Sequence, residues 1–262
     1  MVNGKNIALT GASSGIGKAI AHELAGAGAN LILIGRDKER LTQVQQTLGG
    51  THQALVADIS TEDGRQSIVE ACQGMESGLD ILVNAAGVEG FTGFEDMNDE
   101  KITNIIHINL TSTIILTKAL LPILRKNRES QIVNIGSAFA GIAFPGFTVY
   151  SASKFGLRGF TEALRRELMD SDIAVRYFAP RGTDTPFNNS DVAVLNKELK
   201  VNIDRPEQVA KEFMGFMQTN KPRYSVGRPE RIFTFMNKVF PGLVDKALFK
   251  QLPVIKQCLP KK

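Results

Sequence analysis

Short apolar runs alternate with longer segments of helical periodicity along most of this chain. Apolar runs of four to six residues suit buried strands, and the segments between them are long enough for helices. Strands that are apolar on both faces are typical of a parallel sheet with helices on each side. Because crossovers between parallel strands are right-handed, the pattern predicts an α/β fold with a doubly wound parallel sheet of about seven strands in three layers.

This alternation also places the individual elements. Strands are expected at residues 6–10, 30–34, 54–57, 81–83, 131–135, 174–178 and 224–226. Helices are expected at residues 16–27, in a polar segment ending at 48, at 63–74, 99–125, from Tyr150 to about 169, and at 206–218. The stretch 182–202 is polar and poorly periodic, which predicts a mobile loop over a site.

Composition places the chain in a broad class. A length of 262 residues, with 43% hydrophobic and 22% charged residues, favours one soluble globular α/β domain. The only cysteines are Cys72 and Cys258, so no disulfide framework is expected. No apolar run is expected to reach membrane-spanning length, and the N-terminus leads straight into a strand-like segment, which argues against a signal peptide. We therefore expect a reducing, cytoplasmic setting.

Charge is concentrated at the C-terminus. Residues 228–262 contain eight Lys or Arg against two acids, a charge of +6, which leaves −2 for the other 227 residues of a chain with net charge +4. A nucleic-acid footprint on the main domain is therefore not supported. The histidines His22, His52 and His107 lie on separate expected elements without chelating spacing, so no metal site is expected.

A glycine-rich motif, Thr-Gly-Ala-Ser-Ser-Gly-Ile-Gly at residues 10–17, joins the first expected strand to the first helix. Glycines allow a tight turn and let backbone N–H groups approach a pyrophosphate, and the helix N-terminus adds partial positive charge. A plain glycine-rich turn is the alternative. The position after the first strand favours a dinucleotide site of the Rossmann type.

The ends of other strands can complete such a site. Small residues at 84–87 leave room for adenine and ribose, and Asp58 can accept from the adenine amino group, although either feature can also be a strand-end cap. The second strand ends in Gly35 and Arg36. A guanidinium suits a ribose 2′-phosphate, which favours NADP(H). If the register shifted by one residue, Asp37 would lie at the ribose and favour NAD(H) instead.

Tyr150 and Lys154 stand four residues apart at the start of an expected helix, so their side chains share one face. A free tyrosine titrates near ~10, and a nearby cation lowers that pKa toward the working range of an acid–base catalyst. Such pairs also occur on exposed helix faces. Ser137, upstream of the pair, and the glycine motif favour the catalytic interpretation.

Together these motifs resemble the short-chain dehydrogenase/reductase family over about residues 3–227. The family's Asn-Asn-Ala-Gly motif corresponds to Asn-Ala-Ala-Gly at 84–87. The resemblance implies a catalytic set of Asn109, Ser137, Tyr150 and Lys154. Tyr150 would exchange the hydroxyl proton, Ser137 would bind the substrate oxygen, and Lys154 would lower the pKa of Tyr150 and bind the nicotinamide ribose. Asn109, at a helix distortion, would hold a water of a proton relay.

The resemblance also implies the cofactor contacts. The turn after the sixth strand keeps Thr185, which usually meets the nicotinamide carboxamide, but Arg181 replaces a glycine. Arg181 could narrow the pocket, hold an acidic substrate group or point to solvent. The full set of expected cofactor contacts is Gly11, Ser13, Ser14, Gly15, Ile16, Gly17, Arg36, Asp58, Ile59, Asn84, Ala85, Ala86, Gly87, Tyr150, Lys154, Pro180, Thr183 and Thr185.

The segment 228–262 extends beyond the expected catalytic domain, 1–227, and is not expected to be an independent domain. Apolar residues recur there at three-to-four spacing with basic residues between them, and Pro241 and Gly242 predict a division into two short helices. Three interpretations stay open for it. It can pack on the body or a sister subunit, cover a long apolar substrate, or lie on an anionic membrane surface as a peripheral contact.

The combined prediction is an NADP(H)-dependent oxidoreductase that acts on a carbonyl or secondary alcohol, with a 3-oxoacyl, fatty or steroid-like substrate. The apolar segment 139–145 would line the substrate pocket, or else pack in the core. The alternative is a catalytically silent cofactor-binding sensor or scaffold with the same fold. The resemblance further implies a homodimer or homotetramer.

Overall fold

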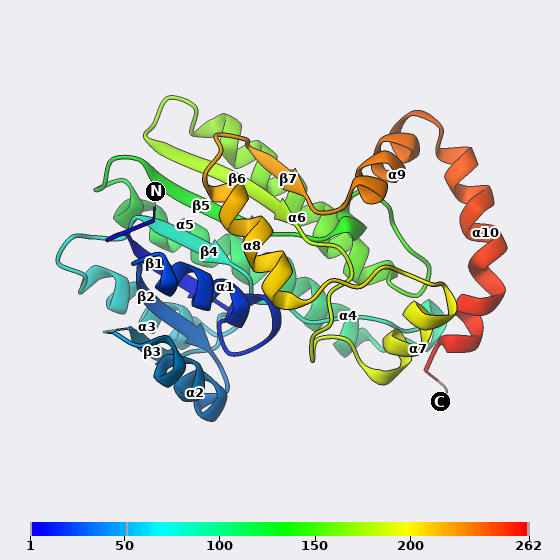
Figure 1. Cartoon of the computed structure of the whole chain (residues 1–262), viewed down its shortest axis with the longest axis horizontal. Coiled ribbons are helices and arrows are strands. Elements are labelled where there is room, and N and C mark those ends of the chain that lie inside the picture. Colours follow the sequence, from blue (N-terminus) through cyan, green and yellow to red (C-terminus); the bar gives the residue numbers. More distant parts are fainter. Residues whose placement is uncertain (1, 51, 261–262) are drawn as a thin grey trace.

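A seven-stranded parallel sheet forms the centre of the molecule, in the order β3-β2-β1-β4-β5-β6-β7. The computed structural model describes residues 2–50 and 52–260, so the parts of the predicted domain and tail at 1, 51, 261 and 262 lie outside the description. Each predicted strand is confirmed with ends that differ by at most one residue. The strands are β1 (Asn6–Thr10), β2 (Asn30–Gly35), β3 (Gln53–Val56), β4 (Ile81–Asn84), β5 (Ser130–Ile135), β6 (Ile173–Ala179) and β7 (Arg223–Ser225) (Figure 1).

Helices cover both faces of this sheet, which confirms the three-layer prediction. Successive residues of β1 alternate between the faces: Ile7 and Leu9 belong to one buried cluster and Ala8 to the other. The first face packs against α1 (Gly15–Gly26), α2 (Lys38–Leu48) and α8 (Pro206–Met217), and the second against α3 (Glu62–Gln73), α5 (Thr113–Leu124) and α6 (Thr148–Glu167). The order in which strands are added to the sheet reverses between β1 and β4, so the carboxyl ends of these parallel strands border a crevice.

The long helix predicted at 99–125 is present but distorted. It consists of α4 (Asp99–Ile106), a π-helix (His107–Ser112) and α5, so Asn109 lies at a helix distortion, as expected. By length and composition alone the run from Asp99 to Leu124 could cross a membrane, because an 18-residue window within it has mean hydropathy 1.4. The expectation that no segment reaches that length is therefore wrong, because a helix that covers a central sheet is itself apolar. It packs on α3, β4 and β5, as a core helix does.

The prediction of a loop at 182–202 is wrong for residues 190–198, which form a helix. Helix α7 (Ser190–Glu198) forms there because Asn189 caps it by accepting a hydrogen bond from the Val192 amide at 2.9 Å. Val192 and Leu195 are buried, whereas the exposed side of the helix includes the apolar Val194, which is 51% exposed. Two buried residues in nine are too few to give a clear periodic signal in the sequence.

The C-terminal segment forms two helices, α9 (Arg228–Val239) and α10 (Pro241–Cys258), divided at Pro241 as predicted. Proline suits the first turn of each helix because its missing N–H would have no partner there. Helix α10 lies against α9 and α7 at the end of the molecule where the strands have their carboxyl ends (Figure 1).

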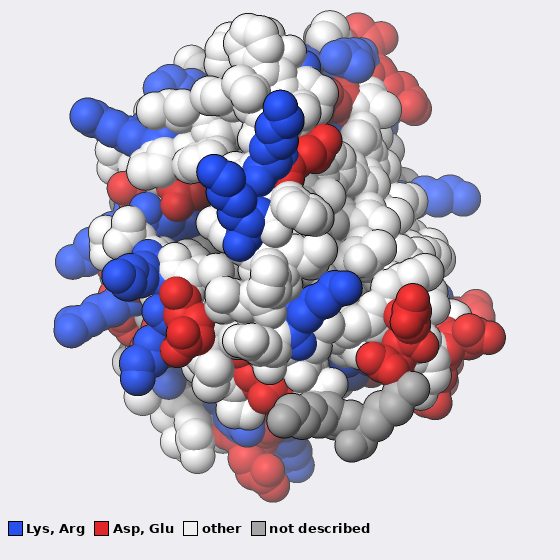
Figure 2. Space-filling view, turned by 90° about the vertical axis from the view of Figure 1, so that its right-hand side faces the viewer, with Lys and Arg blue, Asp and Glu red and all other residues white. Residues whose placement is uncertain are grey.

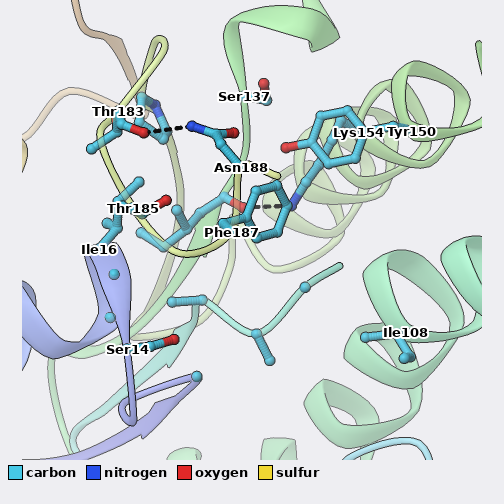
Figure 3. Close-up of a pocket in the computed structure, with 18 of the residues that line it drawn as sticks. Ser14, Ile16, Ile108, Ser137, Tyr150, Lys154, Thr183, Thr185, Phe187 and Asn188 are labelled. Atoms are coloured by element: carbon cyan, nitrogen blue, oxygen red, sulfur yellow. Dashed lines mark hydrogen bonds between the residues drawn. The ribbon is translucent and has the colours of Figure 1, made fainter. Parts of the chain in front are cut away.

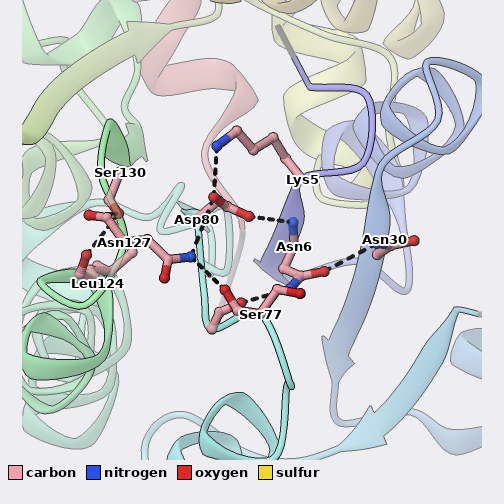
Figure 4. A network of polar contacts seen from close by, with 9 residues as sticks. Lys5, Asn6, Asn30, Ser77, Asp80, Leu124, Asn127 and Ser130 are labelled. Atoms are coloured by element: carbon pink, nitrogen blue, oxygen red, sulfur yellow. Dashed lines mark hydrogen bonds and ion pairs between the residues drawn. The ribbon is translucent and has the colours of Figure 1, made fainter.

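A polar network ties the strands together at the opposite, amino edge of the sheet (Figure 4). Asp80, just before β4, accepts hydrogen bonds from Lys5 Nζ and from the Asn6 amide, each at 2.8 Å. The Asn6 side chain binds Gly78 O at 2.7 Å and accepts from Asn30 Nδ2 at 3.1 Å. These contacts link β1, β2 and β4, so the crevice residues at the other end rest on strands in a fixed register.

Candidate active site

One cavity of about 850 Å³ opens at the carboxyl edge of the sheet. It lies where the strand order reverses, the usual ligand position in open α/β sheets. The residues that follow four adjacent strands line it: Gly11 after β1, Ala85 after β4, Ser137 after β5 and Pro180 after β6. Figure 3 shows the glycine-loop side, with Ser14 and Ile16, facing the side that carries Tyr150 and Lys154.

The glycine motif folds as a cradle for phosphate. Gly11 has φ +70°, and a side chain there would come within 2.9 Å of Ala86 Cα. A side chain at Gly17 would come within 2.1 Å of Gly11 O, so helix and loop pack too closely for any other residue. Gly15 has φ +54° and begins α1, whose N-terminus faces the cavity. This arrangement fits a dinucleotide pyrophosphate.

The far end of the cavity combines several charges. Arg36 is 60% exposed and contacts Asp58 at 3.5 Å. Asp37 caps α2, accepting from the Arg40 amide at 3.0 Å, and pairs with the Arg40 side chain at 3.1 Å. Gly35, at the end of β2, contributes no carboxylate. The prediction that Arg36 and Asp58 lie at the cofactor site agrees with their position on the cavity wall, and Arg40 joins them there.

Tyr150 and Lys154 are buried side by side on α6, with exposures of 8% and 5%. Lys154 Nζ lies 5.7 Å from the centre of the Tyr150 ring and donates to Ile135 O at 3.3 Å. The Tyr150 hydroxyl points toward the cavity on the side of Ser137 (Figure 3). The two side chains therefore share one helix face and meet the cavity together, as their spacing predicts.

Burial dominates the titration of this pair. Desolvation raises the pKa of Tyr150 to about 12, a hydrogen bond with Ser137 lowers it, and the negative charge of Glu89 raises it further. Desolvation also lowers the pKa of Lys154 to about 8. The prediction that the pKa of Tyr150 is lowered is therefore wrong, because burial of the phenol raises this pKa more than the hydrogen bond with Ser137 lowers it.

Ser137 and Asn109 hold different positions in the site. Ser137 lies on the cavity wall, and its hydroxyl accepts a hydrogen bond from the Phe139 amide at 3.1 Å. The backbone amide of Ser137 donates to the Tyr177 hydroxyl at 3.3 Å, which fixes the position of the residue. Asn109 is fully buried, and its amide exchanges hydrogen bonds with the Val88 backbone at 2.8 and 2.9 Å. Asn109 thus braces the turn after β4 beside Lys154, and its proton-relay role stays a prediction.

Most of the expected cofactor contacts line the cavity, and one side chain does not. Asn84 Nδ2 donates to Thr117 Oγ1 at 3.1 Å and to Asn134 Oδ1 at 2.8 Å, so this side chain lies under the floor of the cavity. The expected contacts that do line it are Gly11, Ser13, Ser14, Gly15, Ile16, Gly17, Arg36, Asp58, Ile59, Ala85, Ala86, Gly87, Tyr150, Lys154, Pro180, Thr183 and Thr185.

Arg181 makes contacts that the sequence did not predict. Its guanidinium forms a two-pronged ion pair with buried Asp204, at 2.8 and 2.7 Å, and contacts Glu230 of α9 at 3.5 Å. The hydrogen bonds with Asp204 raise the pKa of the guanidinium. The interpretation that Arg181 points to solvent is therefore wrong, and its acidic partner belongs to the protein.

Apolar side chains form the wall around Tyr150. The rings of Phe139, Phe147 and Phe187 lie 6.2, 6.1 and 6.0 Å from the Tyr150 ring, centre to centre. Of the predicted pocket segment 139–145, Phe139 and Phe144 reach the cavity. Sequence reasoning missed the remaining apolar lining, which comes from Phe147, Phe187 and the α7 region: Val192, Leu195, Leu199 and Val201.

Comparison with known proteins agrees with this geometry. A sequence model described as short chain dehydrogenase matches residues 5–195. The chain is 31% identical to a 3-dehydrosphinganine reductase from Danio rerio over 223 residues, which cover 80% of this chain and 67% of that protein. It is 34% identical to the 3-oxoacyl-[acyl-carrier-protein] reductase FabG of Escherichia coli K12 over 182 residues, covering 70% of this chain and 75% of that one.

Solved structures with the same architecture contain bound dinucleotides. A 3-ketoacyl-(acyl-carrier-protein) reductase from Brucella melitensis complexed with NADH matches with TM-score 0.78 and 28% identity, over 86% of this chain and 98% of that one. A short-chain dehydrogenase from Sphingobium yanoikuyae in complex with NADPH matches with TM-score 0.78 and 26% identity, over 92% and 95%. Both cofactor types thus occur among similar structures.

Proposed function

The chain belongs to the short-chain dehydrogenase/reductase family, and from that premise we propose that it is an NADP(H)-dependent reductase of a hydrophobic carbonyl compound. At the coarser level it is an NAD(P)-dependent oxidoreductase acting on carbonyl and alcohol groups. The observation that carries the proposal is the position of Tyr150, with its hydroxyl on the cavity wall beside Ser137 and across from the glycine loop.

The chain's own residues would handle the oxygen and its proton. When bound, the cofactor supplies a hydride to the carbonyl carbon. In reduction, Tyr150 donates its proton to the carbonyl oxygen, and its raised pKa keeps that proton available near neutral pH. The Ser137 hydroxyl binds the same oxygen as negative charge develops on it. Lys154 would stabilise the phenolate left on Tyr150 and hold the nicotinamide ribose. Thr185, which lies against Gly15, would hold the carboxamide.

The preference for NADP(H) rests on the end of β2. The Arg36 side chain is exposed enough to reach a 2′-phosphate. The Asp37 carboxylate instead accepts from the Arg40 backbone amide and pairs with the Arg40 side chain, so it is not directed at a ribose. A charged hydrogen bond contributes ~1.5–3 kcal/mol, so Arg36→Ala should raise the Kd for NADPH about 10- to 100-fold and change the Kd for NADH little.

Fluorescence titration of both cofactors against wild type and Arg36→Ala measures this preference. Arg128→Ala, an exposed arginine that does not line the cavity, is the matched control and should leave both Kd values unchanged. Tighter binding of NADH than NADPH by the wild type would contradict the NADP(H) assignment without touching the reductase assignment.

The hydrophobic substrate is inferred from the phenylalanine- and leucine-lined half of the cavity. The relatives named as reductases of 3-dehydrosphinganine and of 3-oxoacyl-[acyl-carrier-protein] support a 3-oxo lipid substrate. A buried methylene contributes ~0.8 kcal/mol, so kcat/KM should rise about fourfold per added methylene until the cavity is filled.

NADPH oxidation over a chain-length series of 3-oxoacyl thioesters tests this substrate class. A flat series would contradict the hydrophobic assignment. If NADPH binds but no member of a broad ketone panel is reduced, the catalytically silent sensor or scaffold becomes the better description of the protein.

A further inference from the structure

The inner face of the C-terminal helix pair is fully used by the fold. On α9, Glu230 contacts Arg181, and Asn237 Nδ2 donates to Gly141 O at 3.0 Å. On α10, Val244 and Ile255 are buried, and Ile255 belongs to the apolar cluster that contains Tyr150. The pair is therefore fastened to the walls of the substrate cavity, and its opposite side is left without a partner among the described residues.

That outer face of the α9–α10 pair exposes an unusual number of large apolar side chains. Phe235 is 64% exposed and Phe249 is 74% exposed. A phenylalanine presents roughly 150–250 Å², so a group of such side chains exceeds the scattered apolar exposure of an ordinary monomer surface. The exposed set is Ile232, Phe233, Phe235, Val239, Phe240, Leu243 and Phe249.

Cations are mixed with these apolar side chains, whereas anions are nearly absent. Glu230 is turned inward to Arg181, which leaves Asp245 as the one outward acid between residues 228 and 260. Figure 2 shows this end of the molecule, where Lys and Arg side chains project from a largely uncharged central surface and groups of Asp and Glu side chains lie mainly toward its sides and lower part. The cations of the segment are Arg228, Arg231, Lys238, Lys246, Lys250 and Lys256.

Charge complementarity decides between the possible occupants of this face. A second copy of the chain would bring six cations against six like charges, which disfavours self-pairing. An anionic bilayer offers acyl chains for the phenylalanines and phosphate groups for the lysines and arginines at once. Ile255 of α10 packs in the cluster that contains Tyr150, Val192 and Leu195, which line the cavity, so the helix pair lies next to the cavity's apolar end.

We propose that the outer face of the α9–α10 pair docks the protein on an anionic membrane surface. The apolar side chains enter the interfacial region and the cations pair with lipid phosphates, while α9 and α10 stay folded on the body. Docking does not depend on catalytic activity. It would bring a cavity lined by phenylalanine and leucine close to the lipid.

Vesicle flotation with the full chain tests this docking. Wild type should float with vesicles of phosphatidylcholine plus about a third phosphatidylglycerol and not with phosphatidylcholine alone, and high salt should weaken the binding. The double variant Phe235→Ser/Phe249→Ser should lower the partition coefficient at least about tenfold, as should Lys246→Gln/Lys250→Gln. Met169→Ser, at a methionine that follows the end of α6 and is 65% exposed, should change nothing.

Circular dichroism and light scattering keep these results interpretable. All variants should keep the wild-type spectrum, because the substituted side chains are exposed. Equal binding to neutral vesicles, or no binding to anionic ones, would overturn the proposal. A third result would also overturn it: the wild type does not bind vesicles but forms an assembly, and Phe235→Ser/Phe249→Ser dissociates that assembly. The outer face would then join copies of the chain. The docking proposal does not require these variants to lose reductase activity. A failed flotation experiment would therefore leave the reductase assignment unaffected, and the reverse also holds.

Discussion

Tyr150 and Lys154 are both buried, and burial favours the neutral form of each: it raises the pKa of Tyr150 and lowers the pKa of Lys154. A phenol that keeps its proton to about pH 12 is a secure proton donor, whereas an ammonium with a pKa of about 8 sits near the working range. The titration that limits the reaction should therefore belong to Lys154.

The lowered pKa of Lys154 predicts an alkaline limit on carbonyl reduction. As the pH rises through about 8, Lys154 loses its charge while Tyr150 stays protonated. A neutral amine stabilises the phenolate formed on proton donation less well, so kcat should fall above that pH by up to about tenfold per unit. Initial rates at saturating NADPH over the alkaline range measure this.

Lys154→Arg is the control for this fall in rate at alkaline pH, because a guanidinium keeps its charge throughout that pH range. Its rates should be lower than those of wild type but should not fall further with rising pH. A wild-type profile that stays flat well above pH 8 would show that the charge of Lys154 does not limit turnover.

Single residues were predictable where a local spacing fixes them. Tyr150 and Lys154 follow from one helix turn, and the glycines from a loop whose backbone admits no side chain. Tyr177, which holds the Ser137 amide, and Glu89, which acts on Tyr150, come from distant segments. No local pattern in the sequence marks them, because their role exists only after the sheet has formed.

At the scale of elements, strands were easier to predict than the helix that covers the cavity. A strand such as β1 is buried on both faces, so its composition alone marks it. Helix α7 is short and mostly exposed, and only its Asn189 cap gives a local signal. The aromatic wall was predicted in part, since Phe139 and Phe144 adjoin a recognised motif whereas Phe187 does not.

The network at the amino edge of the sheet predicts a stability effect. Asp80 is 7% exposed and accepts from Lys5, the Asn6 amide and, at 3.4 Å, Asn127. Asp80→Ala leaves these donors without their shared acceptor, so the free energy of unfolding should fall by about 2–4 kcal/mol. Urea unfolding measures the loss, and Asp172→Ala, at an exposed aspartate, should change it little.

The network lies at the far edge of the sheet from the cavity, so the KM for NADPH should be unchanged in Asp80→Ala at a temperature where the variant is folded. An Asp80→Ala variant as stable as wild type would show that the network does not hold β1 and β4 together.

At the scale of the whole molecule, the outward sides of α5 and α6 predict self-association. Ile115 and Phe155 are 38% and 41% exposed there. We expect a homodimer or homotetramer in light scattering, and Ile115→Glu/Phe155→Glu should shift it toward monomer by placing charge in an apolar contact.

Val56→Glu is a suitable control for that measurement, because Val56 is 49% exposed at the edge strand β3. It should leave the assembly intact. A wild-type protein that is monomeric at micromolar concentration would contradict the expected pairing.

The whole-molecule arrangement was predicted to the extent that it follows from element order. Alternating strands and helices leave few topologies, so the sheet and its cleft could be derived. The packing of α10 against α7, and the tie from Glu230 to Arg181, could not, because they depend on where the chain returns after the sheet is complete.

The central claim is that Tyr150 passes a proton to a carbonyl oxygen inside the dinucleotide cleft. Rates of NADPH oxidation with a long-chain 3-oxoacyl thioester, compared between wild type and Tyr150→Phe, test it most directly. We predict that Tyr150→Phe lowers kcat by ~10²–10⁴ while the Kd for NADPH stays within about twofold, because only the hydroxyl is removed. A Tyr150→Phe variant that binds NADPH and turns over at the wild-type rate would contradict the claim.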